Sequence, residues 1–331
     1  MNSIEKKTLS IIIPTYNRSV QIQRTVKSLA QAELPRNLRV EVIVVDNNSR
    51  ADHGRRYLEL VETQRAEFHL RYEFEKKQGR SHACNRGLNA ATSEWVGFID
   101  DDEAVDSSWL MRAHFWIASS EADYIGGPCI PEWEAVPPKW LPAHSGQYRG
   151  ILGWIELSPH VISYDDFDGE LCGGNFIAKS DLLTKVGGFN TNLGRSAGNL
   201  LGGEDGDLHR RIKDAGAKGF YDPEFSILHS IPVNRMTFSY HVRWAYWSGV
   251  ANGIRLENGD GRRESVPHLF GVPRYWFSKA FRGVIVFLIE TLSFRINTKP
   301  RGVVGLMDCF YLYGLLKKVG LSISNKNHEL S

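Results

Sequence analysis

The sequence is poor in several features that mark particular protein classes. Its 331 residues include four cysteines, which lie far apart and form no C-x-x-C pair. This spacing argues against a zinc ribbon or a disulfide scaffold and favours a reducing compartment. The net charge of +2 gives no general argument for nucleic acid as a partner. The first residues lead directly into a strand-like run without the apolar core of a signal peptide, so we expect a cytoplasmic protein.

Two nucleotide-binding motifs are also missing. The first predicted strand, residues 9–14, is followed by Thr15-Tyr16-Asn17-Arg18 and not by G-x-G-x-x-G, which argues against a dinucleotide site. A G-x-x-x-x-G-K-[ST] motif is absent as well, which excludes P-loop nucleotide hydrolysis. A diphosphate bound to this chain would therefore need a metal ion to neutralise its charge.

The first half of the chain alternates between strand and helix patterns. Short β-branched or alternating runs predict strands at 9–14, 40–45, 69–74 and 95–99, and apolar residues at helical spacing separate them. This order predicts an α/β protein with a mostly parallel sheet and helices on both faces. The 42% apolar and 24% charged content is ordinary for a globular protein of this length.

Polar clusters follow the predicted strands. In a parallel sheet such clusters share one edge and line a single crevice. For each cluster alone, ordinary turn chemistry is the alternative explanation. The clusters are Thr15-Tyr16-Asn17-Arg18, Asp46-Asn47-Asn48, Gln78-Gly79-Arg80 and Asp100-Asp101-Asp102.

The acidic cluster is the most informative of the four. If the backbone stays extended after the strand, Asp100 and Asp102 project to one side and Asp101 to the other. Two carboxylates on one side suit a hard divalent cation, which prefers oxygen ligands. The alternative is an acidic surface turn.

Four motifs together resemble the family-2 glycosyltransferases of the GT-A (Rossmann-like) fold. They are IIIPTYNR, VIVVDNNS, QGRSHACNRGLNAA and FIDDDE, and the resemblance covers about residues 9 to 230. It implies a nucleotide-sugar donor, an inverting reaction and a D-x-D motif at Asp100 and Asp102. In that motif Asp100 reaches the ribose side and Asp102 binds Mn2+ or Mg2+. The donor-binding residues that the resemblance implies are Pro14, Thr15, Tyr16, Asn17, Asp46, Gly79, Arg80, Asn85 and Asp100.

The family also often places a histidine near the metal and the diphosphate. His229 occupies the matching position here, so we expect it to be a second metal ligand. A histidine that is satisfied in the core or in a loop is the alternative.

A second acidic motif lies about a hundred residues downstream. Leu208, Ile212 and Ala215 predict a helix, which places Glu204 and Asp205 at its start, where helix capping alone would explain them. A positioned carboxylate also suits the removal of a proton from an acceptor hydroxyl. Family-2 enzymes carry Glu-Asp-x-x-Leu at this point, so we predict Asp205 as the general base and Glu204 as a residue that binds or orients the acceptor.

The middle of the chain is expected to form the acceptor side. Residues 132–154 are rich in aromatics and proline, which predicts a lid loop with Trp133 against the acceptor, or rings that pack locally against the sheet. The segment 172–178 resembles the family's acceptor-side strand, which implies contacts from Gly174 and Asn175. We interpret Asp165-Asp166-Phe167-Asp168 as a solvated loop.

We expect a glycosyltransferase domain at 8–235 and a helical region at 236–331. The donor half would span about 8–105 and the acceptor half about 106–235. The apolar stretches 283–294 and 302–316 are interrupted by Glu290 and Asp308, so they fall short of the ~20 apolar residues that a spanning helix needs. Basic residues between 274 and 318 suggest helices that lie on an anionic membrane surface, peripheral on its inner face. A subdomain packed on the core is the alternative.

These features predict a metal-dependent glycosyltransferase that moves a sugar from a nucleotide-diphosphate sugar to a saccharide or lipid-linked acceptor. A bacterial surface polysaccharide or glycan pathway would be its setting, with no role for nucleic acid. A nucleotidyltransferase is an alternative, although residues 14–18 do not form the Gly-rich basic loop that it needs. A binding protein that has kept the fold and lost activity is a second alternative.

Overall fold

The computed structural model describes residues 6–63, 68–141, 149–167, 169–258, 266–293 and 300–329. The chain divides into two compact units. The first, called the sheet unit here, comprises Met1–Glu132, Gly153–Ala197 and Glu204–Ser230. The second, the helical unit, comprises Trp133–Leu152, Gly198–Gly203 and Ile231–Ser331.

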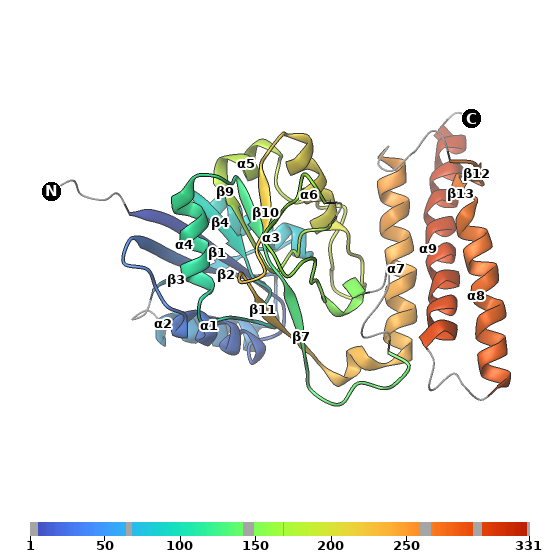
Figure 1. Ribbon diagram of the computed structural model, residues 1–331, viewed down its shortest axis with the longest axis horizontal. Helices are drawn as coiled ribbons and strands as arrows, with labels where there is room; N and C mark the ends of the chain where they lie inside the picture. The colour runs from blue at the N-terminus through green and yellow to red at the C-terminus, as the bar shows by residue number, and fades with distance from the viewer. Residues whose placement is uncertain are drawn as a thin grey trace. The chain divides into compact units, whose positions relative to one another are not determined.

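An eight-stranded sheet organises the sheet unit (Figure 1), in the order β3-β2-β1-β4-β9-β6-β10-β8. The first four strands in this order pair in parallel, as the sequence predicted, whereas β9 runs antiparallel to both of its neighbours. The strand bounds are β1 Lys7–Thr15, β2 Leu38–Asp46, β3 His69–Phe74, β4 Trp95–Phe98, β6 Tyr124–Gly126, β8 Ile162–Ser163, β9 Phe176–Lys179 and β10 Gly219–Tyr221.

Both faces of this sheet are covered by helices, because successive side chains of its strands point to opposite faces. On β1, Ile11 and Ile13 belong to one buried cluster and Ile12 to the other. Apolar residues of α1 and α4 join the first cluster, and those of α3, α5 and α6 join the second. These helices are α1 Gln21–Gln31, α3 Arg80–Ala90, α4 Trp109–Ser119, α5 Ser180–Lys185 and α6 Glu204–Asp214, and α2 spans Ala51–Thr63.

A small second sheet joins distant parts of the chain. Its order is β5-β11-β7, with bounds Glu103–Val105, Ile227–Ile231 and Cys129–Trp133. The antiparallel register of β11 and β5 places His229 opposite Glu103. The residue after the acidic triplet is therefore paired with the segment that carries the predicted histidine ligand.

The helical unit contains three long helices, as expected for the C-terminal region. Figure 1 shows α9 (Pro300–Glu329) between α7 (Phe238–Glu257) and α8 (Tyr275–Leu292), and α9 contacts both of them. Gly283 and Gly305 face each other so closely that a Cβ on either would meet the backbone of the other. A short hairpin of β12 (His268–Leu269) and β13 (Val272–Pro273) precedes α8. None of the helices in the described ranges has both the length and the hydropathy needed to cross a membrane.

Candidate active site

The polar clusters meet at the carboxyl edge of the parallel strands, as predicted. β1 ends at Thr15 and β2 at Asp46, and these two residues are paired in register. β4 lies on the other side of β1 and leads to the acidic triplet. Gly79, with φ 139, begins α3, and its N–H donates to the side chain of Asn47 at 2.8 Å. Glycine suits this position because its φ is rarely adopted by other residues.

The acidic triplet does not continue the strand, which corrects the first expectation for its geometry. β4 ends at Phe98, and Glu103 N–H donates to the Asp100 carbonyl at 3.2 Å, which closes a turn around Asp101 and Asp102. The Glu103 side chain also accepts the Asp100 N–H at 2.7 Å. Asp101 and Asp102 share Arg18 while Asp100 pairs with Arg80, so the rule of alternating sides does not apply to them.

Asp101 is buried and not turned away from the site. Its carboxylate accepts from Thr15 Oγ1 at 2.6 Å and from Arg18 Nη1 at 2.8 Å. Burial raises the pKa of Asp101 to about 6, although the charge of Arg18 opposes the rise. Asp101 therefore fixes the end of β1 and the Arg18 side chain beside the other acids.

Asp102 and His229, the two predicted metal ligands, lie together. Asp102 Oδ2 is 3.7 Å from His229 Nε2, and the Asp102 carbonyl accepts the Ser230 N–H at 3.0 Å. Arg18 Nη1 lies 2.8 Å from the same Oδ2. One carboxylate and one imidazole are a donor set that fits Mn2+. Arg18 would have to turn away from a cation at that oxygen, and its side chain is 37% exposed.

Arg80 joins the two acidic motifs, which are far apart in sequence. Its guanidinium lies 2.8 Å from Asp100 Oδ1 and 3.0 Å from Asp205 Oδ1, with Glu204 Oε1 at 3.4 Å. It also donates to the Gly173 carbonyl at 3.0 Å. Three carboxylates around one cation place residues 100 and 205 in a single charged cluster.

Glu204 and Asp205 open α6, as predicted, and differ in accessibility. The Glu204 side chain is 5% exposed and that of Asp205 is 32% exposed. Burial, followed by the charge of Asp205, raises the pKa of Glu204 to about 7. Burial also raises the pKa of Asp205, and Arg80 opposes that rise. A Cβ at position 173 would overlap the Asp205 carboxylate, so a larger residue there would displace that side chain.

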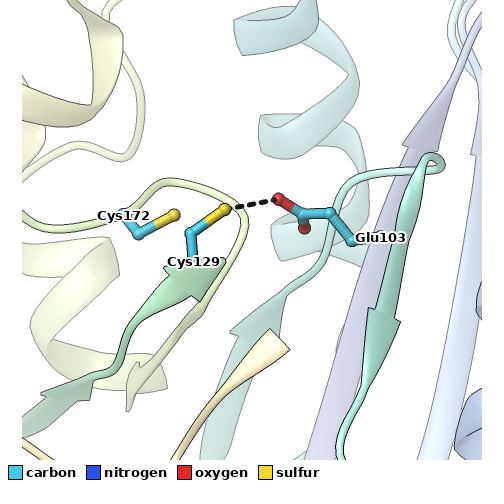
Figure 2. Close-up of side chains that lie close together, drawn as sticks. All are labelled: Glu103, Cys129 and Cys172. Atoms are coloured by element: carbon cyan, nitrogen blue, oxygen red, sulfur yellow. Dashed lines mark hydrogen bonds between the residues drawn. The ribbon is translucent and has the colours of Figure 1, made fainter. Parts of the chain in front are cut away.

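A buried trio of Glu103, Cys129 and Cys172 backs this site (Figure 2). Their ligand-type atoms lie within 4.8 Å of one another, a grouping that the wide cysteine spacing did not reveal. Hydrogen bonding with Cys172 and burial raise the pKa of the Cys129 thiol, and burial raises the pKa of Glu103. A protonated Cys129 thiol is a poor metal ligand, and the Glu103 carboxylate already holds the Asp100 N–H. We therefore interpret the trio as a support beneath Asp100 and the 172–174 segment.

Two predicted site residues have structural partners within the fold. Asn175 is fully buried, and its amide bonds Trp109 Nε1 and the carbonyls of Pro128 and Phe225, so its assignment to acceptor binding does not fit this position. The Asn85 amide bonds both the N–H and the carbonyl of Phe189, at 2.8 Å each, so it fixes that loop.

The structure also places the remaining predicted site residues. Asp46 accepts from Ser49 N–H and Tyr72 OH, both at 2.9 Å, and Tyr16 is 37% exposed at the end of β1. Pro14 is buried in β1, and Asn17 has φ 55 and accepts a hydrogen bond from Arg50 N–H. Gly174 packs against Glu103, and Trp133 belongs to the helical unit.

Four residues of the site were not assigned a role from sequence: Arg18, Asn47, Asp101 and Glu103. Arg18 and Asn47 belong to the polar clusters, so their position was visible. Their partners were not, because a long or branched polar side chain chooses among neighbours that only the fold brings close.

Comparisons with known proteins identify the family. Residues 10–159 match the family described as glycosyl transferase family 2. The succinoglycan biosynthesis protein ExoM of Rhizobium meliloti (strain 1021) is 29% identical over 261 residues, which cover 78% of each chain. Residues 10–159 of this chain form a family-2 glycosyltransferase domain.

Two further relatives of the glycosyltransferase extend the comparison. A glucosyl-dolichyl phosphate glucuronosyltransferase of Haloferax volcanii is 25% identical over 253 residues, 74% of this chain and 76% of the relative. A mannosyltransferase structure from Pyrobaculum calidifontis, in complex with GDP-Man and Mn2+, matches with a TM-score of 0.62 and 20% identity. That match covers 95% of this glycosyltransferase and 87% of the other chain, and it supports the GT-A fold.

Proposed function

We propose that this glycosyltransferase is metal-dependent and inverting, and that it moves a sugar from a nucleotide-diphosphate sugar to a saccharide or lipid-linked acceptor. The observation that carries the proposal is the position of Arg80, which holds Asp100 of the donor motif and Asp205 of the second motif in one cluster. A donor held at the first motif would therefore have a carboxylate within the same site.

The donor side is formed by residues at the ends of β1, β2 and β4. Asp46 and Thr15, which are paired in register, face the base and ribose in this proposal, and Asp100 reaches the ribose side. Asp102 and His229 would hold the metal, which supplies positive charge to the departing diphosphate when bound. The complex of the similar mannosyltransferase with GDP-Man and Mn2+ supports this choice of donor and metal.

Asp205 is the residue that we assign as general base. Its side chain is exposed enough to meet an acceptor, whereas Glu204 is nearly buried and better placed to orient its neighbour. Arg80 binds Asp205 Oδ1, which favours the ionised form of the carboxylate. In this mechanism the carboxylate takes the proton of the acceptor hydroxyl as the oxygen attacks the anomeric carbon. Attack opposite the leaving group inverts that centre.

The names of two relatives support the acceptor class. ExoM is a succinoglycan biosynthesis protein, and the Haloferax enzyme bears the name of a dolichyl phosphate sugar. We therefore propose a role in the synthesis of a bacterial surface polysaccharide or another glycan. For a lipid-linked acceptor, a peripheral position of the helical unit on the inner face of the cell membrane would be useful.

Two substitutions test the donor and base roles separately. Asp102→Ala should abolish the thermal stabilisation that a nucleotide-sugar gives in the presence of Mn2+. Asp205→Asn should keep this stabilisation and lower turnover by roughly 10²–10⁴-fold, the usual scale for a general base. Asp166→Asn, on an exposed loop, is the matched control and should change neither measurement.

Each role can fail independently. Wild-type turnover in Asp205→Asn would remove the base assignment. Unchanged Mn2+-dependent donor binding in Asp102→Ala would remove the metal assignment.

A further inference from the structure

The outer face of α8 carries an unusual amount of exposed apolar surface. Large apolar side chains recur along it at helical spacing and are 40–78% exposed: Phe281, Val284, Ile285, Leu288, Ile289 and Leu292. The opposite face is buried through Trp276, Ala280, Gly283 and Glu290. A helix of this kind normally buries one apolar stripe and exposes polar residues. In α8 the second stripe lies outside the packed interface with α9.

The other long helix that packs on α9 does not share this property. Within α7, the described residues include one exposed large apolar side chain, Phe238, at the first position of the helix. Both helices contact α9 through glycines that allow close approach, Gly249 in α7 and Gly283 in α8. The exposed stripe therefore distinguishes α8 from α7 and does not follow from packing on α9 alone.

The charges around the stripe have one sign. Between residues 268 and 292 the single acidic residue is Glu290, which is buried and accepts the Gly302 N–H at 2.6 Å. Arg274 and Arg282 are exposed, and at 100° per residue Arg274 lies in line with the stripe while Arg282 lies at its rim. The stripe is exposed and bordered by arginine, and the one acidic residue, Glu290, is buried on the opposite face of the helix. This arrangement matches an interfacial helix on an anionic membrane.

The hairpin before α8 provides a second, independent observation. Its two-residue turn is Phe270-Gly271, with φ values of 51 and 74. A positive φ suits glycine but is uncommon for a bulky residue, and the Phe270 side chain is 72% exposed. The ring lies 6.5 Å from that of Phe277, on the side of α8 next to the stripe. A strained, exposed aromatic residue indicates a function other than packing.

We propose that the α8 stripe and Phe270 form one docking surface for an anionic lipid bilayer. The helix would lie in the interface with its apolar side chains between the acyl chains and with Arg274 and Arg282 at the phosphates. This inference rests on the proposed peripheral position of the enzyme and specifies the surface that makes the contact. The alternative partner for the stripe is a second copy of the chain. Such a dimer would leave Arg274 and Arg282 without anionic partners.

The test is co-sedimentation of the full-length protein with vesicles. The wild type should bind vesicles of phosphatidylcholine mixed with phosphatidylglycerol and bind pure phosphatidylcholine more weakly. Leu288→Ser/Leu292→Ser should lower the partition coefficient by about a hundredfold, because each of the two leucines buried on binding contributes on the order of tenfold. Arg282→Gln should lower binding about fivefold on the mixed vesicles only. Met111→Ser/Phe115→Ser, an exposed apolar pair at the same spacing on α4, should bind as the wild type does.

Two further measurements separate the outcomes. Sedimentation velocity without lipid should show the same monomer for the wild type and Leu288→Ser/Leu292→Ser. A wild-type dimer that this variant dissociates, or equal vesicle binding by both, would overturn the proposal. Thermal stabilisation by a nucleotide-sugar with Mn2+ should be equal in both proteins. If the nucleotide-sugar did not stabilise the wild type, this result would count against the proposed donor site and would not bear on the docking surface.

Discussion

In the sheet unit, charged side chains lie in the interior, whereas in the helical unit a row of large apolar side chains lies on the surface. Glu103, Asp101 and Glu204 are each at most 5% exposed, yet Leu292 is 78% exposed. Both arrangements oppose the usual distribution of residue types. The buried charges have partners at hydrogen-bond distance, which explains how the fold holds them. The exposed apolar stripe has none among the described residues of its unit, which points to a partner outside the chain.

Removal of Arg80 should have the largest effect on the buried charges of the sheet unit. Arg80→Met should leave the carboxylates of Asp100, Glu204 and Asp205 without their shared cation and lower the free energy of unfolding by about 3–5 kcal/mol. The measurement is urea unfolding at pH 7. Arg86→Met, on the same helix, removes an exposed pair with Glu73 and should lower that free energy by no more than about 1 kcal/mol. Equal losses would show that Arg80 is not a structural hub.

A smaller effect is expected from the titration of Glu204. Its pKa is raised from 4.5 to about 7, so the folded protein binds a proton that the unfolded chain has already released in this range. The associated stability is present below pH 4.5 and is lost as the pH rises through about 7. Glu204→Gln should therefore match the wild type at pH 4 and unfold with a free energy roughly 3 kcal/mol higher at pH 8. Glu94→Gln, at an exposed carboxylate, should match the wild type at both pH values. If the difference in free energy of unfolding between Glu204→Gln and the wild type were the same at pH 4 and pH 8, the raised pKa would be contradicted.

The smallest effect concerns the helical unit. Phe270→Gly should raise the free energy of unfolding by about 0.5–1 kcal/mol, because glycine adopts the positive φ without strain. The same variant should bind anionic vesicles less well than the wild type does. Thermal unfolding and co-sedimentation of one preparation measure both effects. A loss of stability would mean that Phe270 serves packing, and the contrast between the two units would weaken.

Much of this arrangement was predictable from the sequence. The parallel strands place their carboxyl ends at one edge by geometry, so Thr15, Asp46 and the acidic triplet had to lie near one another. The start of α6 at Glu204 followed from the apolar spacing of the residues after it.

Other parts depended on contacts between distant residues. The turn at Asp101 and Asp102 is closed by the Glu103 side chain as it reaches back to the Asp100 N–H, which a strand pattern does not reveal. The burial of Asn175 depends on Trp109 and on two carbonyls from other segments. For α8, the apolar period is visible in the sequence, but the choice of the exposed face is made by α9.

The reversed strand β9 has a consequence for how the protein is made. β9 lies between β4 and β6, so the hydrogen-bonding edge of β4 stays open until residues 176–179 have been synthesised. At about 5–20 residues per second, the ribosome needs about 4 to 16 seconds to cover the distance from Phe98 to Lys179. During that interval a nascent chain with four formed strands presents an unpaired apolar edge next to its acidic turn. During this interval, contact with a chaperone or rapid synthesis of residues 99–179 would best protect the unpaired edge of β4 from aggregation.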